Sequence, residues 1–265
     1  MQMDDRWGDT GTWVGEELRR EAFFFTSGDE RLYGSLYAAA GRTPRDGVAI
    51  CNSWGFEGNQ SDRTMHRLAL AHARAGGAAL LFHYPGFGDS PGNLAEASME
   101  TLVEAAVDAT AEGSRRLPGT SWAPAGLMFG ASIAALAARR GTADRLLLVQ
   151  PALRPSHYFA RLERSARRVA VRIPARTGNA YGYPLPRRIL TAAPAIDVAV
   201  AEALARFGGK GAVVRYAEPA RSELIPERFE DVVLSGRWRF GAHQSPELAE
   251  AAASWLREST AEPVE

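Results

Sequence analysis

The chain has few of the residues that build disulfide frameworks, cysteine-based metal sites or membrane spans. Cys51 is the only cysteine among 265 residues, which excludes an internal disulfide and a zinc site made of cysteines. Lys210 is the only lysine, so nearly all basic residues are arginine. Basic and acidic residues balance at 31 against 31, and this gives no overall field that favours nucleic acid or an anionic membrane.

Long apolar runs are also missing. No stretch reaches the roughly 18 apolar residues of a membrane span, and the polar start at residues 1–5 differs from a secretory signal. We therefore expect a cytoplasmic protein. Hydrophobic residues make up 46% of the chain, which is ordinary for a globular protein with a buried core.

Short apolar runs alternate with helix-like segments along most of the chain. Continuous apolar strands between helices favour a mostly parallel sheet that helices cover on both faces, an α/β fold. We expect a hairpin of strands at 22–26 and 31–37, and further strands at 48–51, 78–82, 126–129, 145–149, 212–216 and 229–234. We expect helices at 63–75, 98–113, 133–140, 156–169, 196–207 and 245–257.

The order and spacing of these segments predict the domain organisation. Residues 1–20 are polar and are expected to form an N-terminal arm or a short helix. Residues 21–150 and 210–259 are expected to form the core. The stretch 151–209 contains an irregular part rich in proline, glycine and tyrosine, and it is expected to be a cap inserted over the sheet edge.

One stretch has the pattern of a nucleophile elbow, in which a serine stands on a sharp strand-to-helix turn. Strand-like residues run into Gly130-Ala131-Ser132-Ile133-Ala134, and an alanine-rich helical run follows. Small residues two positions before and after Ser132 would let strand and helix pass closely. The same pattern also fits a small residue at a tight turn without any chemistry.

A serine needs a base to take its proton and a third group to hold that base. Of the five histidines, His243 follows the last predicted strand, where its imidazole could reach Ser132. His66 and His72 lie in a helix, which favours structural roles. His157 begins the inserted segment, where it could contact a ligand or lie at a solvated helix start. His83 ends a strand beside a turn-rich loop, and we expect it to contact substrate.

The acidic partner should follow the predicted strand 212–216. Glu218 is the first carboxylate there and precedes a proline, which favours extended backbone. Glu223 and Glu227 remain alternatives, and Asp197 and Asp231 fit less well because of their places in the chain.

An oxyanion needs preorganised hydrogen-bond donors. The backbone N–H of Ile133 and that of Trp54, in the loop after Cys51, are the expected donors. Phe56 and Tyr183 are further candidates for contacting substrate.

Together these features resemble the α/β-hydrolase superfamily over residues 21–259. The resemblance rests on the elbow pattern, on the loop Pro85-Gly86-Phe87-Gly88-Asp89-Ser90-Pro91-Gly92 and on the late His243. The stretches 51–57 and 81–90 are similar to the exosortase A system-associated and serine aminopeptidase S33-like hydrolases. Two departures are Asn52-Ser53 in place of the usual histidine-glycine pair, and a missing glycine-x-x-aspartate in the acid loop.

The resemblance implies about eight strands, a helical cap at 151–209 and no cofactor or metal. It implies that Ser132 attacks a carboxylic ester or thioester, that His243 moves the proton and that water resolves the acyl-enzyme. The partner would be a small acyl substrate, free or carried by a carrier protein or coenzyme A. The oligomeric state, monomer or homodimer, stays open.

Two other functions fit the same residues. An acyltransferase or cyclase would use Ser132 with an acceptor other than water, in an aromatic pocket from Trp54, Phe56, Tyr181 and Tyr183. A binding protein on a hydrolase scaffold would use neither serine nor histidine.

Overall fold

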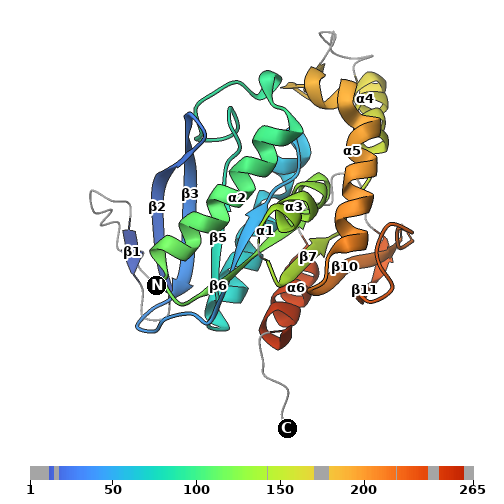
Figure 1. Cartoon of the computed structure of the whole chain (residues 1–265). Coiled ribbons are helices and arrows are strands. Elements are labelled where there is room, and N and C mark those ends of the chain that lie inside the picture. The colour runs from blue at the N-terminus through green and yellow to red at the C-terminus, as the bar shows by residue number, and fades with distance from the viewer. Residues whose placement is uncertain are drawn as a thin grey trace.

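A mostly parallel sheet organises the chain in the computed structural model (Figure 1). The structure describes residues 12–14, 18–141, 143–169, 179–218, 220–237 and 245–259. Nine strands lie in the order β1-β2-β3-β5-β4-β6-β7-β10-β11, and β8 and β9 form a separate hairpin. The strands are β1 (Thr12–Val14), β2 (Leu18–Ser27), β3 (Glu30–Ala39), β4 (Asp46–Cys51), β5 (Ala78–Phe82), β6 (Ser121–Leu127), β7 (Arg145–Val149), β8 (Asn179–Ala180), β9 (Tyr183–Pro184), β10 (Lys210–Glu218) and β11 (Glu230–Arg237).

Six helices longer than one turn connect or cover these strands in the described residues. They are α1 (Gly55–Arg74), α2 (Met99–Arg116), α3 (Phe129–Arg140), α4 (Pro155–Val169), α5 (Arg187–Arg206) and α6 (Pro246–Ser259). Helices α2, α3 and α5 pack in a row, and α1 packs against α6, which gives two helical layers. The view in Figure 1 shows α2 in front of the sheet.

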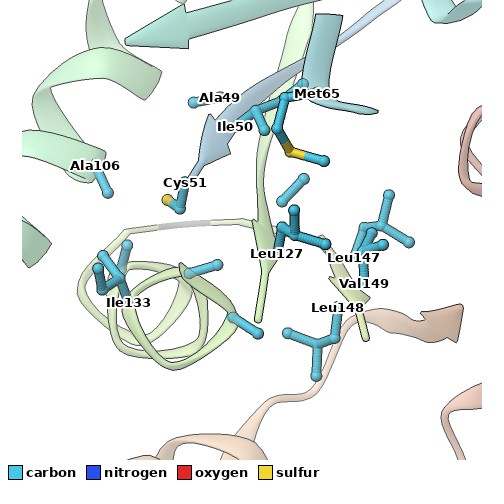
Figure 2. Packing of buried hydrophobic residues seen from close by; sticks show 14 of the residues in the cluster. Ala49, Ile50, Cys51, Met65, Ala106, Leu127, Ile133, Leu147, Leu148 and Val149 are labelled. Atoms are coloured by element: carbon cyan, nitrogen blue, oxygen red, sulfur yellow. The ribbon is translucent and has the colours of Figure 1, made fainter. Parts of the chain in front are cut away.

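The predicted fold class is confirmed. Strands β5, β4, β6, β7, β10 and β11 pair in parallel, and β1, β2, β3 and β5 pair antiparallel. The central strand β4 is buried along its whole length, which explains its continuous apolar sequence. Figure 2 shows part of the resulting core, where Leu127 at the end of β6 and Leu147 to Val149 on β7 lie near one another.

The predicted arm at 1–20 differs from the structure. Residues 12–14 form β1, and β2 begins at Leu18, so the two strands form an antiparallel pair at the sheet edge. Pairing supplies partners for backbone groups that a polar arm would leave to water, and the sequence there shows no alternation that would reveal it.

Two helices begin earlier than their sequence patterns predict. Helix α1 begins at Gly55, where a φ of 50° turns the chain out of the preceding loop. Helix α5 begins at Arg187, before the expected start at 196, and continues through Pro194. Burial of Ile189, Ala193 and Ile196, at about 1.5–3 kcal/mol for each large side chain, offsets the roughly 3 kcal/mol cost of the proline.

The segment between β7 and β10 holds α4, the β8–β9 hairpin and α5. Helix α4 packs on α5, and α5 also packs along α3, so this segment extends the helical layer of α2 and α3. In Figure 1, α4 and the upper part of α5 lie beyond the upper right end of the sheet.

Candidate functional site

The sharp turn between β6 and α3 has Met128 at its apex. Strand β6 ends at Leu127 and α3 begins at Phe129, so Met128 is the only residue between the two elements. Its φ of 51° and ψ of −115° are sparsely populated for a residue with a side chain. The turn is fixed by hydrogen bonds from Met128 N to Val149 O, 3.0 Å, and from Ala152 N to Met128 O, 3.0 Å.

Two glycines allow this turn to close. A Cβ atom on Gly126 would lie 2.3 Å from the carbonyl oxygen of Gly130, and one on Gly130 would lie 2.0 Å from that of Cys51. Neither contact is possible without moving backbone. The small residues of the elbow therefore flank Met128, in the pattern Gly126-Leu127-Met128-Phe129-Gly130.

The predicted place of Ser132 at the apex is wrong. Ser132 is the fourth residue of α3 and is fully buried, and its Oγ donates a hydrogen bond to Ala152 O at 2.8 Å. Ala134, the predicted second small residue of the elbow, is buried further along the same helix. A nucleophilic role for Ser132 stays a prediction, but its hydroxyl has neither an exposed position nor a strained turn beneath it.

Ile133 does not present a backbone donor to the site. It is the fifth residue of α3, and only the first four N–H groups of a helix lack an acceptor within the helix. Its side chain is fully buried, and Figure 2 shows it on α3 near the core residues Cys51 and Ala106. The N–H groups of Phe129 and Gly130, at the start of the helix, are the ones whose positions match an oxyanion hole after Met128.

Trp54 lies where the sequence predicts it, in the loop after β4 and directly before α1. Its indole N–H donates to Pro184 O of the cap hairpin at 3.2 Å. Its ring packs edge-on against Phe129 and Phe159, with centroids 6.3 and 5.9 Å away. Since Trp54, Phe129 and Phe159 are all at most 1% exposed, aromatic side chains fill the space above the elbow.

A buried polar network lies beside these rings. Tyr158 stacks on Phe129, and its hydroxyl lies 3.1 Å from Ser53 Oγ. Arg161 donates to the buried carboxylate of Glu57 at 2.9 Å. Burial raises the pKa of Glu57, although Arg161 and Tyr158 partly oppose this shift. The pKa of Tyr158 also lies well above its usual value because of burial.

The three predicted substrate contacts are occupied by other parts of the protein. His83 Nδ1 accepts from Asp89 N at 3.0 Å within its own loop, and burial lowers the pKa of this histidine. Phe56 stacks on Tyr181 of the cap at 4.8 Å. Tyr183 lies against Gly55 and near the ring of Phe87, so the cap hairpin rests on the start of α1.

The predicted base is His243, and the predicted acid is Glu218, Glu223 or Glu227. His243 lies outside the described residues. Glu218 is the exposed last residue of β10, and Glu223 forms an ion pair with Arg154 of the cap. Glu227 is exposed. The choice among the three carboxylates therefore stays a prediction.

A cavity of about 460 Å³ opens where β7 and β10 end. Three arginines line it, Arg154, Arg161 and Arg221, together with His157 and Glu223. Ala152, which accepts the Ser132 hydrogen bond, and Tyr158 are also part of its wall, so the cavity adjoins the elbow. Sequence reasoning missed this cavity because its arginines come from separate segments of an arginine-rich chain.

No family model matches the sequence, and no curated protein matches it. Solved structures do match the fold. Est1E from Butyrivibrio proteoclasticus, with bound ferulic acid, is 17% identical with a TM-score of 0.64, and the match covers 91% of this chain and 100% of that one. An alpha-beta serine hydrolase homologue from Coxiella burnetii is 17% identical with a TM-score of 0.58, over 91% and 97% of the two chains.

The thioesterase domain from the curacin biosynthetic pathway is 16% identical with a TM-score of 0.52, over 90% of this chain and 98% of that domain. The chain has the α/β-hydrolase fold. The strand order from β2 to β11 and the position of the elbow after β6 agree with this assignment. The narrower likeness to the exosortase A system-associated or S33-like hydrolases stays a prediction.

The described residues contain neither a membrane-spanning helix nor a cluster of metal-binding side chains. None of the helices there combines the length and the apolar character needed to cross a bilayer. No group of three or more histidine, cysteine or acidic side chains in that part of the chain is arranged to hold a metal ion. Cys51 is buried in the core, and burial raises the pKa of its thiol to about 12.

Proposed function

We propose that this protein binds a small carboxylate-bearing molecule at the carboxyl edge of its sheet and forms no acyl-enzyme at the elbow. The observation that carries the proposal is Met128 at the apex of the β6–α3 turn. A thioether has no proton to give to a base and does not form the ester intermediate on which acyl-enzyme catalysis depends. The turn therefore has the backbone geometry of a nucleophile elbow without a nucleophilic side chain at its apex.

The arginine-lined cavity beside the elbow supplies the binding site. Ligands of open α/β sheets bind at the carboxyl ends of the strands, and a volume of about 460 Å³ suits a small molecule. Guanidinium groups bind carboxylates through paired hydrogen bonds. Arg161 lies 2.9 Å from the Glu57 carboxylate and Arg221 lies 3.9 Å from that of Asp231.

Glu223 supports the choice of a carboxylate. Its side chain pairs with Arg154 at the cavity, and the two side chains are 71% and 42% exposed. An ion pair this exposed contributes little to stability, at most about 1 kcal/mol. A ligand carboxylate can thus take the place of the Glu223 carboxylate on Arg154 at small cost.

The competing hypotheses are an ester or thioester hydrolase and an acyltransferase or cyclase, both acting through Ser132. The structural neighbours, which include an esterase, a serine hydrolase homologue and a thioesterase domain, favour hydrolase chemistry in general. To act in this way, Ser132 would have to leave the Ala152 carbonyl and become exposed from within α3.

The first experiment separates these hypotheses. The protein and its Ser132→Ala variant are treated with a fluorophosphonate probe and assayed on p-nitrophenyl esters and acyl thioesters of several chain lengths. We expect no probe on residue 132 and no turnover that depends on Ser132. A probe adduct at Ser132, or turnover lost in the variant, would refute the proposal.

The second experiment measures binding by calorimetry with succinate and citrate as probes and the neutral dimethyl ester of succinate as a comparison. We expect Glu223→Gln to tighten binding of the carboxylates several-fold and Arg154→Gln to weaken it about tenfold or more. Glu227→Gln removes the same charge outside the cavity lining and should leave affinity within about twofold. Equal binding of the neutral ester, or no response to either cavity variant, would contradict a carboxylate site.

A further inference from the structure

A second cavity lies at the opposite edge of the sheet. It has a volume of about 410 Å³ and is lined by the turn before β4, the end of α1 and one residue of α6. Its position is set by Asp46, the first residue of β4, whereas the elbow and the first cavity lie where strands end. The two cavities are therefore separate sites.

Three arginines converge on this second cavity. Arg42 and Arg45 come from the turn before β4, and Arg257 comes from the last turn of α6. Arg42 lies over the backbone at Gly76, where a Cβ atom would be 2.8 Å from its Nη2. Among the described residues, neither Arg42 nor Arg45 forms an ion pair with a carboxylate.

The charge of Asp46, an acidic residue of this cavity, is compensated by a buried arginine outside the cavity lining. Asp46 is buried, and its Oδ2 lies 3.3 Å from Arg145 Nη1 and 3.0 Å from His72 Nε2. Arg145 is itself buried and does not line the cavity. The described lining of the cavity is therefore positively charged, since the Arg42 and Arg45 guanidiniums line it and Asp46, its carboxylate among the described residues, has Arg145 as a counter-charge.

His72 forms part of the wall of this cavity. Its side chain is 1% exposed, lies in the cavity wall and contacts Asp46 through Nε2. Its Nδ1 has no hydrogen-bond partner in the part of the chain that the structure describes. This nitrogen is itself buried, so the imidazole forms part of the cavity wall.

We propose that this second cavity binds a phosphate-bearing small molecule. Several guanidiniums around one small volume match the charge and the oxygen acceptors of a phosphoryl group. A volume of about 410 Å³ has room for a diphosphate or a sugar phosphate, whereas an extended nucleic acid would need a groove that continues beyond it. Of the two cavities, the Arg42 and Arg45 variants change only this one and the Arg154 variant changes only the first, so each site can be tested without the other.

Inorganic pyrophosphate is the probe, and the full-length protein is titrated by calorimetry. The Arg42→Gln/Arg45→Gln double variant should bind it about tenfold more weakly or worse, and raised salt should weaken binding to the wild type. The Arg139→Gln/Arg206→Gln double variant is the matched control, because it removes the same charge from exposed arginines next to Glu202. It should retain affinity within about twofold.

A second readout needs no substitution. Pyrophosphate should shift the imidazole resonances of His72 in an NMR spectrum and leave those of His66 unchanged. His66 lies on the same helix and is held by Tyr37 at 2.8 Å, away from the cavity. Equal weakening in both double variants, an unchanged His72 signal, or no binding at about 10 mM pyrophosphate would overturn the proposal. So would binding of a short single-stranded oligonucleotide that pyrophosphate fails to displace.

Discussion

The Ser132 hydroxyl donates a hydrogen bond of 2.8 Å to the carbonyl oxygen of Ala152, inside the protein. This contact ties α3 to the chain that leaves β7. Ser132→Ala should lower the free energy of unfolding by about 1 kcal/mol, because a buried acceptor loses its donor. Ligand binding at the first cavity should not change. Urea denaturation and calorimetry measure the two effects.

Ser114→Ala is the control for this prediction. Ser114 also donates to a carbonyl oxygen, that of Thr110 at 3.2 Å, but on an exposed part of α2. Its loss should change stability by less than about 0.5 kcal/mol. If Ser132→Ala abolished an activity while leaving stability intact, Ser132 would be chemical rather than structural.

Gly130→Ala should destabilise the protein by more than about 3 kcal/mol. Alanine is the better helix former by about 1 kcal/mol, but its Cβ would lie 2.0 Å from Cys51 O and 2.5 Å from Asn52 O. The clash with backbone outweighs the propensity. Thermal or urea unfolding gives the difference, and Gly208→Ala, with no atom within 4 Å of the added Cβ, should be nearly neutral.

Asp46→Asn should change how stability depends on pH. Burial raises the pKa of Asp46, but His72 and Arg145 outweigh burial and hold this pKa below its usual value of 3.8. The stabilisation is therefore present above pH 3.8 and lost as the pH falls through the lower folded-state pKa. The variant should not show this decrease in stability in acid. Near neutral pH it should be about 3 kcal/mol less stable than the wild type, because the buried charge of Arg145 loses its partner.

Urea unfolding of wild type and Asp46→Asn between about pH 2.5 and pH 7 measures this difference. Asp89→Asn is the matched control, since Asp89 is 69% exposed and should change the pH profile little. Parallel profiles for wild type and Asp46→Asn would mean that Asp46 has its ordinary pKa.

Tyr158→Phe tests the network beneath the cap. It removes the hydroxyl that lies 3.1 Å from Ser53 Oγ and leaves the buried Ser53 hydroxyl without this partner, at a cost of about 1–3 kcal/mol. Adding Ser53→Ala should recover part of the loss, because no unpaired hydroxyl then remains. Additive losses in the double-mutant cycle would show that the two hydroxyls do not interact.

Much of the fold could be predicted from local patterns. The apolar runs at β4, β5 and β7 are buried at every position except the partly buried Leu81, so the sequence marks them clearly. The Ser27-Gly28-Asp29-Glu30 turn was sufficient to predict the β2–β3 hairpin, and Gly28 has a φ of 53° there. Helix α2 begins within one residue of its expected start, where Ser98 and Thr101 form a capping box.

The elbow was misplaced because Gly130 belongs to two overlapping patterns. Gly126-x-Met128-x-Gly130 and Gly130-x-Ser132-x-Ala134 have the same spacing, and a serine is the expected nucleophile. The residue at which β6 ends decides between them, and this depends on pairing with β7 and on contacts of Gly130 with Cys51. Those contacts are non-local, so no window of sequence contains them.

Met128 has the strained backbone of a nucleophile elbow but no nucleophilic side chain. A residue in this backbone conformation costs on the order of 1–3 kcal/mol, whatever its side chain does. In this protein the strained turn serves the chain path. It joins β6 directly to α3 and leaves no loop for solvent or proteases to reach. A strained strand-to-helix turn is thus evidence that the chain turns tightly there. It is evidence of an enzyme only when the side chain at its apex carries a reactive atom.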